Sequence, residues 1–131
     1  MWEKSRRKTD QILNDLKKKF IIKEIYEVKW SKENFSNNLS RFYGLPDVLE
    51  KTKIAGTGPF LLILVSDPNP KFEEMYVSSE KDLANINVYE RKMKNRKWIG
   101  TKFIIHSSIS EKATNQDLTL AFGNISNVPV P

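Results

Sequence analysis

The chain contains no cysteine and only one histidine, His106, among its 131 residues. Disulfide scaffolds, thiolate zinc sites, cysteine nucleophiles and multi-histidine metal sites are therefore excluded. No apolar run approaches the roughly 18 to 20 residues that span a bilayer, and the first residues lack the apolar stretch of a secretory signal. We expect a cytoplasmic protein with no membrane partner, whose chemistry depends on His106, hydroxyls, carboxylates and cations.

The composition is that of a folding domain with a basic surface. Apolar residues make up 39% of the chain and charged residues 29%, which is enough of each for a buried core and a solvated exterior. The length predicts a single domain over residues 1–131. Lys and Arg number 22 against 16 Asp and Glu, so the formal net charge is +6. This charge favours anionic partners, such as nucleotides or nucleic acid, without choosing among them.

Hydrophobic periodicity predicts helices alternating with three strands. Helices are expected over 8–20, 31–43, 46–53, from 82 onward and over 108–123, and strands over 20–30, 60–65 and 102–106. The strand at 60–65 is expected to be buried on both faces, because every residue in it is apolar. Residues 71–81 have no persistent period and are expected to form a surface loop, and 124–131 an irregular tail. This order predicts an α/β (α+β) sandwich with helices packed on one sheet.

Two helix starts carry specific signals. Ser31 has the character of an N-cap, and Trp30 and Phe35 flank it at the spacing of a hydrophobic staple. The segment Ser108-Ile109-Ser110-Glu111 fits a capping box, with Gly123 as the expected end of that helix. The capping box matters most, because it begins two residues after His106.

His106 is expected where the third strand meets the last helix. The free N–H groups at the start of a helix favour negative charge, so a histidine placed there can act as a nucleophile toward phosphorus. A partly buried structural histidine fits the same position. The residues alone leave both interpretations open.

The surrounding segment resembles the active site of nucleoside diphosphate kinases. It reads Lys102-Phe103-Ile104-Ile105-His106-Ser107-Ser108-Ile109-Ser110-Glu111-Lys112-Ala113 and continues to the acidic and apolar turn at 117–122. The resemblance implies that His106 is the phosphorylated residue, with Ser108 beside it. It also implies that Asp117 steadies the imidazole, since 117 − 106 = 11 is the family's spacing. Tyr43 would lie near the histidine.

The resemblance covers residues 8–123 and implies a ferredoxin-like, nucleoside diphosphate kinase-like fold. The substrates it implies are nucleoside di- and triphosphates with Mg²⁺, and Arg91, Arg96 and Lys92 would bind their phosphates. A homo-oligomer is also compatible with it. No resident metal site is expected, because the acidic residues that follow the strand at 60–65 lack a paired Asp-x-Asp.

The chain departs from the family pattern in three places. Nothing at the N-terminus matches the family's opening strand and its phosphate-binding lysine. Phe103 stands where the family has asparagine, and the loop before the final strand is shortened to 95–101.

Two alternatives to the enzyme follow from these departures. One is a catalytically eroded module that binds nucleotides, or binds nucleic acid through its basic runs and the aromatic residues Tyr89, Trp98 and Phe103. The other is a subunit whose partner supplies the missing strand at a sheet edge beside Phe60 to Val65.

Overall fold

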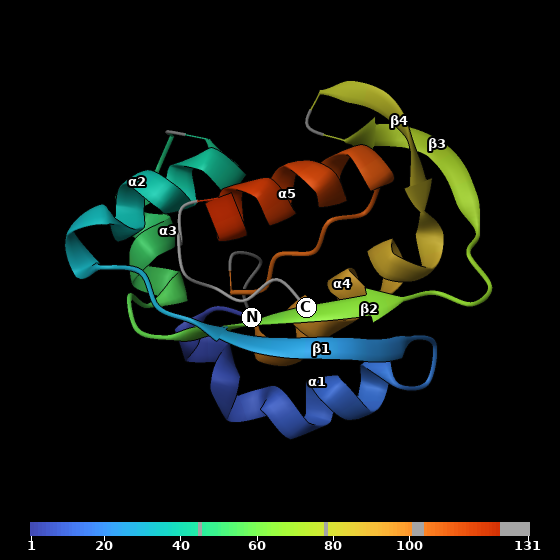
Figure 1. Ribbon diagram of the computed structural model, residues 1–131, viewed down its shortest axis with the longest axis horizontal. Helices are drawn as coiled ribbons and strands as arrows, with labels where there is room; N and C mark the ends of the chain where they lie inside the picture. The colour runs from blue at the N-terminus through green and yellow to red at the C-terminus, as the bar shows by residue number, and fades with distance from the viewer. Residues whose placement is uncertain (45, 78, 101–103, 124–131) are drawn as a thin grey trace.

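The computed structural model describes residues 1–44, 46–77, 79–100 and 104–123. Its elements are η1 (Glu3–Lys8), α1 (Thr9–Leu16), β1 (Ile21–Val28), α2 (Lys32–Tyr43), α3 (Val48–Ala55), β2 (Phe60–Ser66), β3 (Phe72–Val77), β4 (Glu80–Asn85), α4 (Ile86–Ile99) and α5 (Glu111–Gly123). Figure 1 shows β1 and β2 side by side, with α1 on one side of this pair and α5 on the other. The fold is mixed α+β, as the sequence predicts.

The described strands form two separate antiparallel pairs instead of one sheet. β1 pairs with β2 from Ile21↔Ser66 to Val28↔Phe60, with a register shift between Ile22 and Glu24. β3 pairs with β4. The expectation that β2 is buried on both faces is wrong, since Phe60 and Leu61 are buried whereas the rest of the strand is half-buried. The physical reason is that β2 has only β1 as a neighbouring strand in the described residues.

An aromatic cluster forms the main core, where α2 packs against the start of β2. The ring centroids of Trp30 and Phe35 lie 5.2 Å apart, which is the staple contact expected from their spacing. The Ser31 side chain accepts a hydrogen bond from the Asn34 N–H at 3.3 Å, which confirms it as the N-cap of α2. The cluster of buried residues comprises Trp2, Val28, Trp30, Phe35, Leu39, Ala55 and Phe60.

β3 and β4 form a β-hairpin from Phe72 to Asn85, so the surface loop predicted over 71–81 is wrong. β3 and β4 pair from Phe72↔Asn85 to Val77↔Glu80, and Ser79 in the turn has a positive φ of 72°. Phe72, Tyr76 and Leu83 are exposed on this hairpin. With little of the hairpin buried, its sequence needs no alternation of apolar and polar residues, so the periodicity gave no signal.

Of the third strand, predicted at 102–106, only 104–106 lie within the described residues, and these three are not part of a strand. Within the described residues an isolated bridge joins Ala84 to Ser110, after His106. Phe103 and the tail 124–131 likewise lie outside the described residues.

Several helix boundaries differ from the prediction. The first helix, expected over 8–20, is α1 over Thr9–Leu16 and follows η1, and α4 begins at Ile86 because 82–85 belong to β4. The cap of α5 is Ser110, whose hydroxyl accepts a hydrogen bond from the Ala113 N–H at 3.1 Å. Ser108 does not cap this helix, since its hydroxyl binds Asp117. Across the described ranges, no helix is long and apolar enough to cross a membrane.

Candidate functional site

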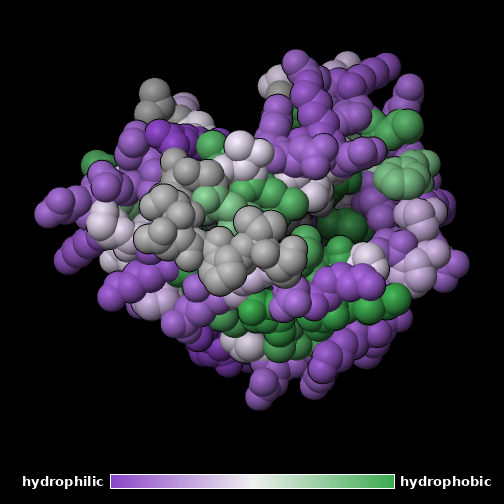
Figure 2. Space-filling view, in the orientation of Figure 1, coloured by the Kyte–Doolittle hydropathy of each residue, from purple (hydrophilic) through white to green (hydrophobic). Residues whose placement is uncertain are grey.

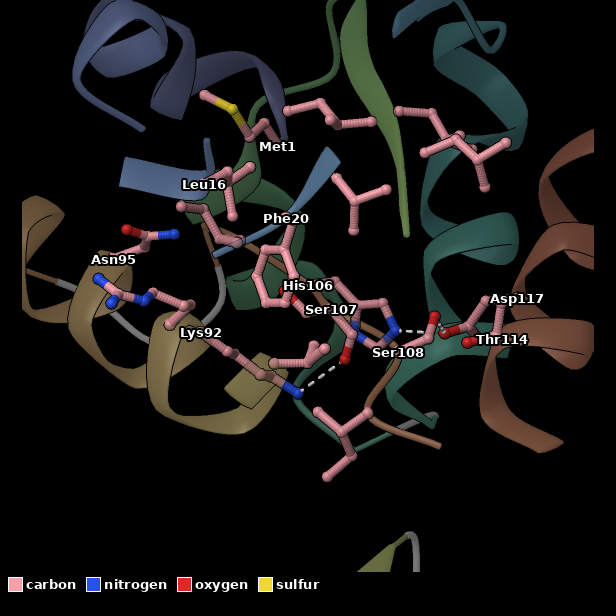
Figure 3. A pocket seen from close by; sticks show the side chains of 18 of the residues that line it. Met1, Leu16, Phe20, Lys92, Asn95, His106, Ser107, Ser108, Thr114 and Asp117 are labelled. Atoms are coloured by element: carbon pink, nitrogen blue, oxygen red, sulfur yellow. Dashed lines mark hydrogen bonds and ion pairs between the residues drawn. The ribbon is translucent and has the colours of Figure 1, made fainter. Parts of the chain in front are cut away.

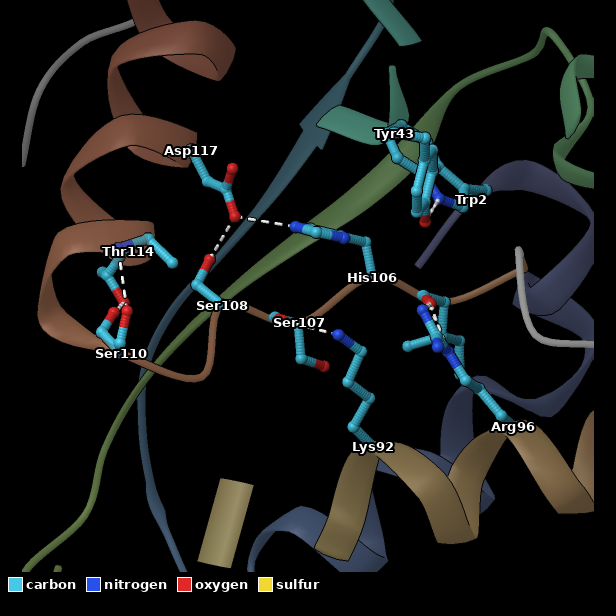
Figure 4. Close-up of polar contacts among 12 residues, drawn as sticks. Trp2, Tyr43, Lys92, Arg96, His106, Ser107, Ser108, Ser110, Thr114 and Asp117 are labelled. Atoms are coloured by element: carbon cyan, nitrogen blue, oxygen red, sulfur yellow. Dashed lines mark hydrogen bonds and ion pairs between the residues drawn. The ribbon is translucent and has the colours of Figure 1, made fainter. Parts of the chain in front are cut away.

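His106 lies on the connection between α4 and α5, and two cations of α4 hold the backbone on either side of it (Figure 4). Arg96 donates from Nε and Nη2 to the Ile105 carbonyl at 3.0 and 2.9 Å. Lys92 donates from Nζ to the Ser107 carbonyl at 3.1 Å. Because residues four apart share one face of a helix, Lys92 and Arg96 reach the same connection. The loop that carries His106 is therefore fixed by charged hydrogen bonds.

Asp117, in the second turn of α5, binds the imidazole directly. Its Oδ2 lies 2.7 Å from His106 Nε2 and also accepts a hydrogen bond from Ser108 Oγ at 2.6 Å. Figure 4 shows Ser108 and His106 reaching this carboxylate from the connection. A carboxylate only accepts hydrogen bonds, so we assign the imidazole proton to Nε2. Nδ1 then carries the lone pair.

The rest of the ring is enclosed by aromatic side chains from the end of α2. Phe42 and Tyr43 meet the imidazole in tilted to perpendicular arrangements, with centroid distances of 5.5 and 5.3 Å. The His106 side chain is 21% exposed, but its Nδ1 is buried and has no hydrogen-bond partner among the described residues. Such an atom is uncommon in native structures, which makes it a candidate for reaction or ligand binding.

The electrostatics of the pair favour a neutral imidazole beside a carboxylate. Burial lowers the pKa of His106, and although the hydrogen bond and charge of Asp117 oppose this, the nearby cations Lys92 and Arg96 lower it further. Burial alone would raise the pKa of Asp117, but hydrogen bonds from His106 and Ser108 keep that pKa below its ordinary value. At neutral pH the Nδ1 lone pair is therefore free of a proton.

Lys92 and Tyr43 also have shifted pKa values. Burial, followed by repulsion from Arg96, lowers the pKa of Lys92 to about 8. Burial raises the pKa of Tyr43 to about 12, against hydrogen bonds from Trp2 and Arg96. The Trp2 indole donates to the Tyr43 hydroxyl at 3.0 Å. Tyr43 is therefore a neutral phenol tied to the aromatic core.

A cleft of about 810 Å³ opens beside His106, between α2, the hairpin, α4 and α5. Its lining includes Arg41, Tyr76, Tyr89, Lys92, His106 and Asp117. This volume lies within the range of small-molecule sites in proteins. The cleft combines cations, aromatic rings and the imidazole, which suits a planar ligand that carries negative charge.

The structure places Arg91 outside this arrangement. Its Nη1 lies 2.7 Å from Asp15 Oδ1, and Lys94 Nζ lies 3.1 Å from the same oxygen. Asp15 is 1% exposed on α1, where two cations compensate its buried charge. The site therefore brings together six of the residues expected from the sequence, namely Tyr43, Lys92, Arg96, His106, Ser108 and Asp117.

The sequence does not predict several of these contacts. Asp15 follows Ile12 by three residues, and an acid on the apolar face of a helix is the pattern that indicates its ion pair with Arg91. Phe42 belongs to the apolar stripe of α2, but it also packs on His106. No sequence pattern indicated that Lys92 and Arg96 would bind backbone carbonyls.

Comparisons with known proteins give no match: no family model, no curated protein and no solved structure is significantly similar to this chain. Within residues 1–44, 46–77, 79–100 and 104–123, no group of three or more His, Cys, Asp or Glu side chains is placed to hold a metal ion. Any functional conclusion therefore depends on the geometry around His106.

Proposed function

We propose that this protein transfers phosphoryl groups between nucleoside tri- and diphosphates through a phosphohistidine at His106, as nucleoside diphosphate kinases do. One observation carries the proposal: Asp117 binds Nε2, which leaves Nδ1 with a lone pair and, among the residues that the structure describes, no hydrogen-bond partner. An imidazole held in this way is an activated nucleophile with a fixed tautomer.

In the proposed reaction, Nδ1 attacks the γ-phosphorus of a nucleoside triphosphate. The Nδ1–P bond forms, the bond from phosphorus to the bridging oxygen breaks, and the nucleoside diphosphate leaves with that electron pair. The Nε2 proton stays in place, and the Asp117 carboxylate compensates the positive charge on the phosphorylated ring. A second nucleoside diphosphate then attacks the phosphorus through a terminal oxygen, which breaks the Nδ1–P bond and restores His106. Mg²⁺ enters as part of the triphosphate substrate and neutralises the leaving phosphates.

Lys92 and Arg96 contribute in two ways. Their hydrogen bonds to the Ser107 and Ile105 carbonyls orient the loop that presents His106. Their positive charges also lie close enough to lower the pKa of His106. In the proposed reaction they stabilise the negative charge that develops on the phosphoryl group beside the ring. Since Nδ1 is buried, phosphorylation requires the ring or the neighbouring aromatic side chains to move.

The test is incubation of the protein with γ-labelled ATP and Mg²⁺, followed by measurement of acid-labile, alkali-stable label. The chain has a single histidine, so any phosphohistidine must be His106. His106→Gln should carry no more label than heat-denatured protein, and Leu49→Ala, which changes an exposed side chain, should label normally. Equal labelling of His106→Gln, or no label on the unaltered protein, would refute the proposal.

The labelling rate should follow a bell-shaped pH profile. The acid limb reports His106, whose lowered pKa keeps Nδ1 unprotonated, so the rate should fall only below about pH 6.5. The alkaline limb reports loss of the Lys92 charge, whose pKa is about 8. Lys92→Arg keeps the positive charge and should remove the alkaline limb while leaving the acid limb in place. An unchanged alkaline limb in Lys92→Arg would exclude Lys92 as its source.

A second candidate is binding without transfer, by an eroded module of the same kind. Two observations favour it: Nδ1 is buried, and Arg91 is bound to Asp15. This candidate predicts that Mg²⁺–nucleotide binds, as measured by calorimetry, while His106 takes up no label. Nucleic acid as the ligand would be distinguished by a steep loss of affinity with rising salt.

A further inference from the structure

The β3–β4 hairpin has an inner and an outer face. Residues that pair directly across an antiparallel ladder lie on the same face, and so do residues two apart along one strand. The register therefore places Glu80 and Ala84 together on the inner face, which packs toward the start of α5. Ala84 is buried and forms a bridge with Ser110, and Glu80 lies 2.6 Å from Lys112. In Figure 1 the hairpin lies at one end of the molecule, apart from the β1–β2 pair.

The outer face of the hairpin carries three large apolar side chains. Phe72, Tyr76 and Leu83 share this face and are 53%, 69% and 56% exposed. In Figure 2 the visible side of the hairpin, at the upper right, is largely hydrophilic, and hydrophobic side chains emerge at its outer margin. A two-stranded sheet needs cover on its apolar face to be stable, and an exposed apolar patch marks an interaction site. The outer hairpin face comprises Phe72, Glu74, Tyr76, Lys81, Leu83 and Asn85.

The charged residues and the leucine of this face lie outside the cavities around His106. One cavity, of about 480 Å³, extends along β2 from Met1 to His106 (Figure 3) and belongs to the site already described. The two aromatic residues of the outer hairpin face border these cavities with part of their surface, but Glu74, Lys81 and Leu83 line neither the cavity nor the cleft. These three residues can therefore be changed without altering the His106 site.

The charges on the outer hairpin face complement themselves. Glu74 lies opposite Leu83 in the register, and Lys81 lies opposite Tyr76. Cross-strand neighbours are about 5 Å apart and residues two apart along a strand about 7 Å, so these four positions form a near square. Glu74 and Lys81 occupy one diagonal of this square. A two-fold axis along the other diagonal brings Glu74 of each copy to Lys81 of the other, and brings Leu83 and Tyr76 to their own counterparts.

We propose that the outer hairpin face is the interface of a two-fold homodimer, in which the hairpins of two copies pack face to face. In this arrangement the strands of the two copies cross at roughly 90°, which is one of the two usual geometries of packed sheets. The inference does not depend on the phosphotransferase proposal, since it uses neither Nδ1 of His106 nor Asp117.

The chemistry of the hairpin favours a second copy over a nucleic acid. The outer hairpin face holds one carboxylate and one ammonium group, so it is neutral and two copies do not repel each other there. A nucleic acid would instead meet an acidic hairpin, because phosphates are repelled by its carboxylates. These carboxylates belong to Glu73, Glu74, Glu80 and Asp82.

The area of the face sets the expected affinity. Large side chains bury roughly 150 to 250 Å² each, so the exposed parts of Phe72, Tyr76 and Leu83 supply about 350 Å² per copy. Stable complexes bury about 800 Å² per partner. The dimer should therefore be weak, with a dissociation constant on the order of 100 μM at physiological ionic strength.

Sedimentation velocity of the whole chain, from about 10 μM to about 1 mM, should show this monomer–dimer equilibrium. Leu83→Asp places two like charges together at the two-fold axis, so it should weaken dimerisation at least about tenfold. The matched control is Leu49→Asp, which introduces the same charge at a 70% exposed side chain on α3. This control should dimerise like the unaltered chain.

Charge reversal tests the two-fold arrangement itself. Glu74→Lys and Lys81→Glu each bring like charges together twice, so each variant should self-associate at least about tenfold more weakly than the unaltered chain. In an equal mixture, the two variants regain both attractive pairs. We therefore expect the mixture to form a heterodimer with about the affinity of the unaltered homodimer.

Three results would each overturn the proposal. A chain that stays monomeric at millimolar concentration would exclude the homodimer and leave the outer hairpin face to a different partner. Equal self-association of Leu83→Asp and the unaltered chain would place the dimer interface elsewhere. Charge-reversed variants that are folded, as circular dichroism shows, but do not associate when mixed would exclude the two-fold pairing of Glu74 with Lys81.

Discussion

Replacing Asp117 by asparagine is expected to slow phosphorylation of His106 by roughly 10³-fold. The Asp117 carboxylate accepts a hydrogen bond from His106 Nε2–H at 2.7 Å and so keeps the lone pair on Nδ1. An asparagine amide can donate to Nε2 instead, which moves the ring proton to Nδ1 and blocks the nucleophile. The measurement is the single-turnover rate of label transfer from γ-labelled ATP.

A control variant separates the effect of Asp117 on the imidazole tautomer from its effect on the position of the loop. Ser108→Ala removes a second hydrogen bond to the same carboxylate oxygen but leaves an acceptor for Nε2, so we expect a loss of about tenfold or less. The ¹⁵N chemical shifts of the imidazole report which nitrogen is protonated, and they should exchange only in Asp117→Asn. Unchanged shifts together with a normal labelling rate in that variant would contradict the assigned role of Asp117.

Phe35→Ala is expected to destabilise the fold by about 4 kcal/mol. The Phe35 side chain is fully buried, and its ring lies 5.2 Å from that of Trp30 and 6.1 Å from that of Trp2. Removing it leaves a cavity between α2 and β2 that these rigid rings cannot fill. Thermal unfolding should shift downward by roughly 10 to 20 °C for a domain of this size.

The matched control for Phe35→Ala is Leu49→Ala, since Leu49 is 70% exposed and should change stability by less than about 0.5 kcal/mol. Chemical denaturation measures both variants. The same core also holds the site, because Phe42 and Tyr43 extend from α2 to His106. A loss of less than 1 kcal/mol in Phe35→Ala would show that the aromatic cluster can collapse around the missing ring.

Local elements could be predicted from the sequence where the signal is contained in a few residues. Ser31 caps α2, and Trp30 meets Phe35 across the cap, as their spacing predicts. β1 and β2 lie where β-branched and apolar residues gather. In each case the interacting residues are close in the sequence, or one face of an element is buried, so composition and period report the structure directly.

The β3–β4 hairpin could not be predicted in this way. Phe72, Tyr76 and Leu83 are exposed on it, so burial imposes no alternation on its sequence. The segment before His106 shows the opposite case. Its apolar run is typical of a strand, but Ile104 and Ile105 are buried against α1 and α4 side chains in a second core cluster and have no strand partner in the described residues.

The contact of His106 with Asp117 spans only eleven residues, so a connection and the first turns of α5 suffice to form it. The contact of Arg91 with Asp15 joins residues 76 positions apart, on α4 and α1. Both arginines of α4 were expected at the phosphates, but the helix turns them to different neighbours. Arg96 faces the His106 connection, and Arg91 faces α1.

The sequence by itself determined the basic charge, the single available histidine, the α+β character, the capped start of α2 and the proximity of Asp117 to His106. These properties arise from composition or from residues separated by few positions. Only the tertiary structure decided that Arg91 neutralises a buried acid, that Lys92 and Arg96 hold backbone carbonyls, and that the Trp2 indole binds the Tyr43 hydroxyl beside His106. Each of these contacts depends on how segments that are separated in the sequence pack together. The sequence alone does not show which of several similar side chains becomes the partner.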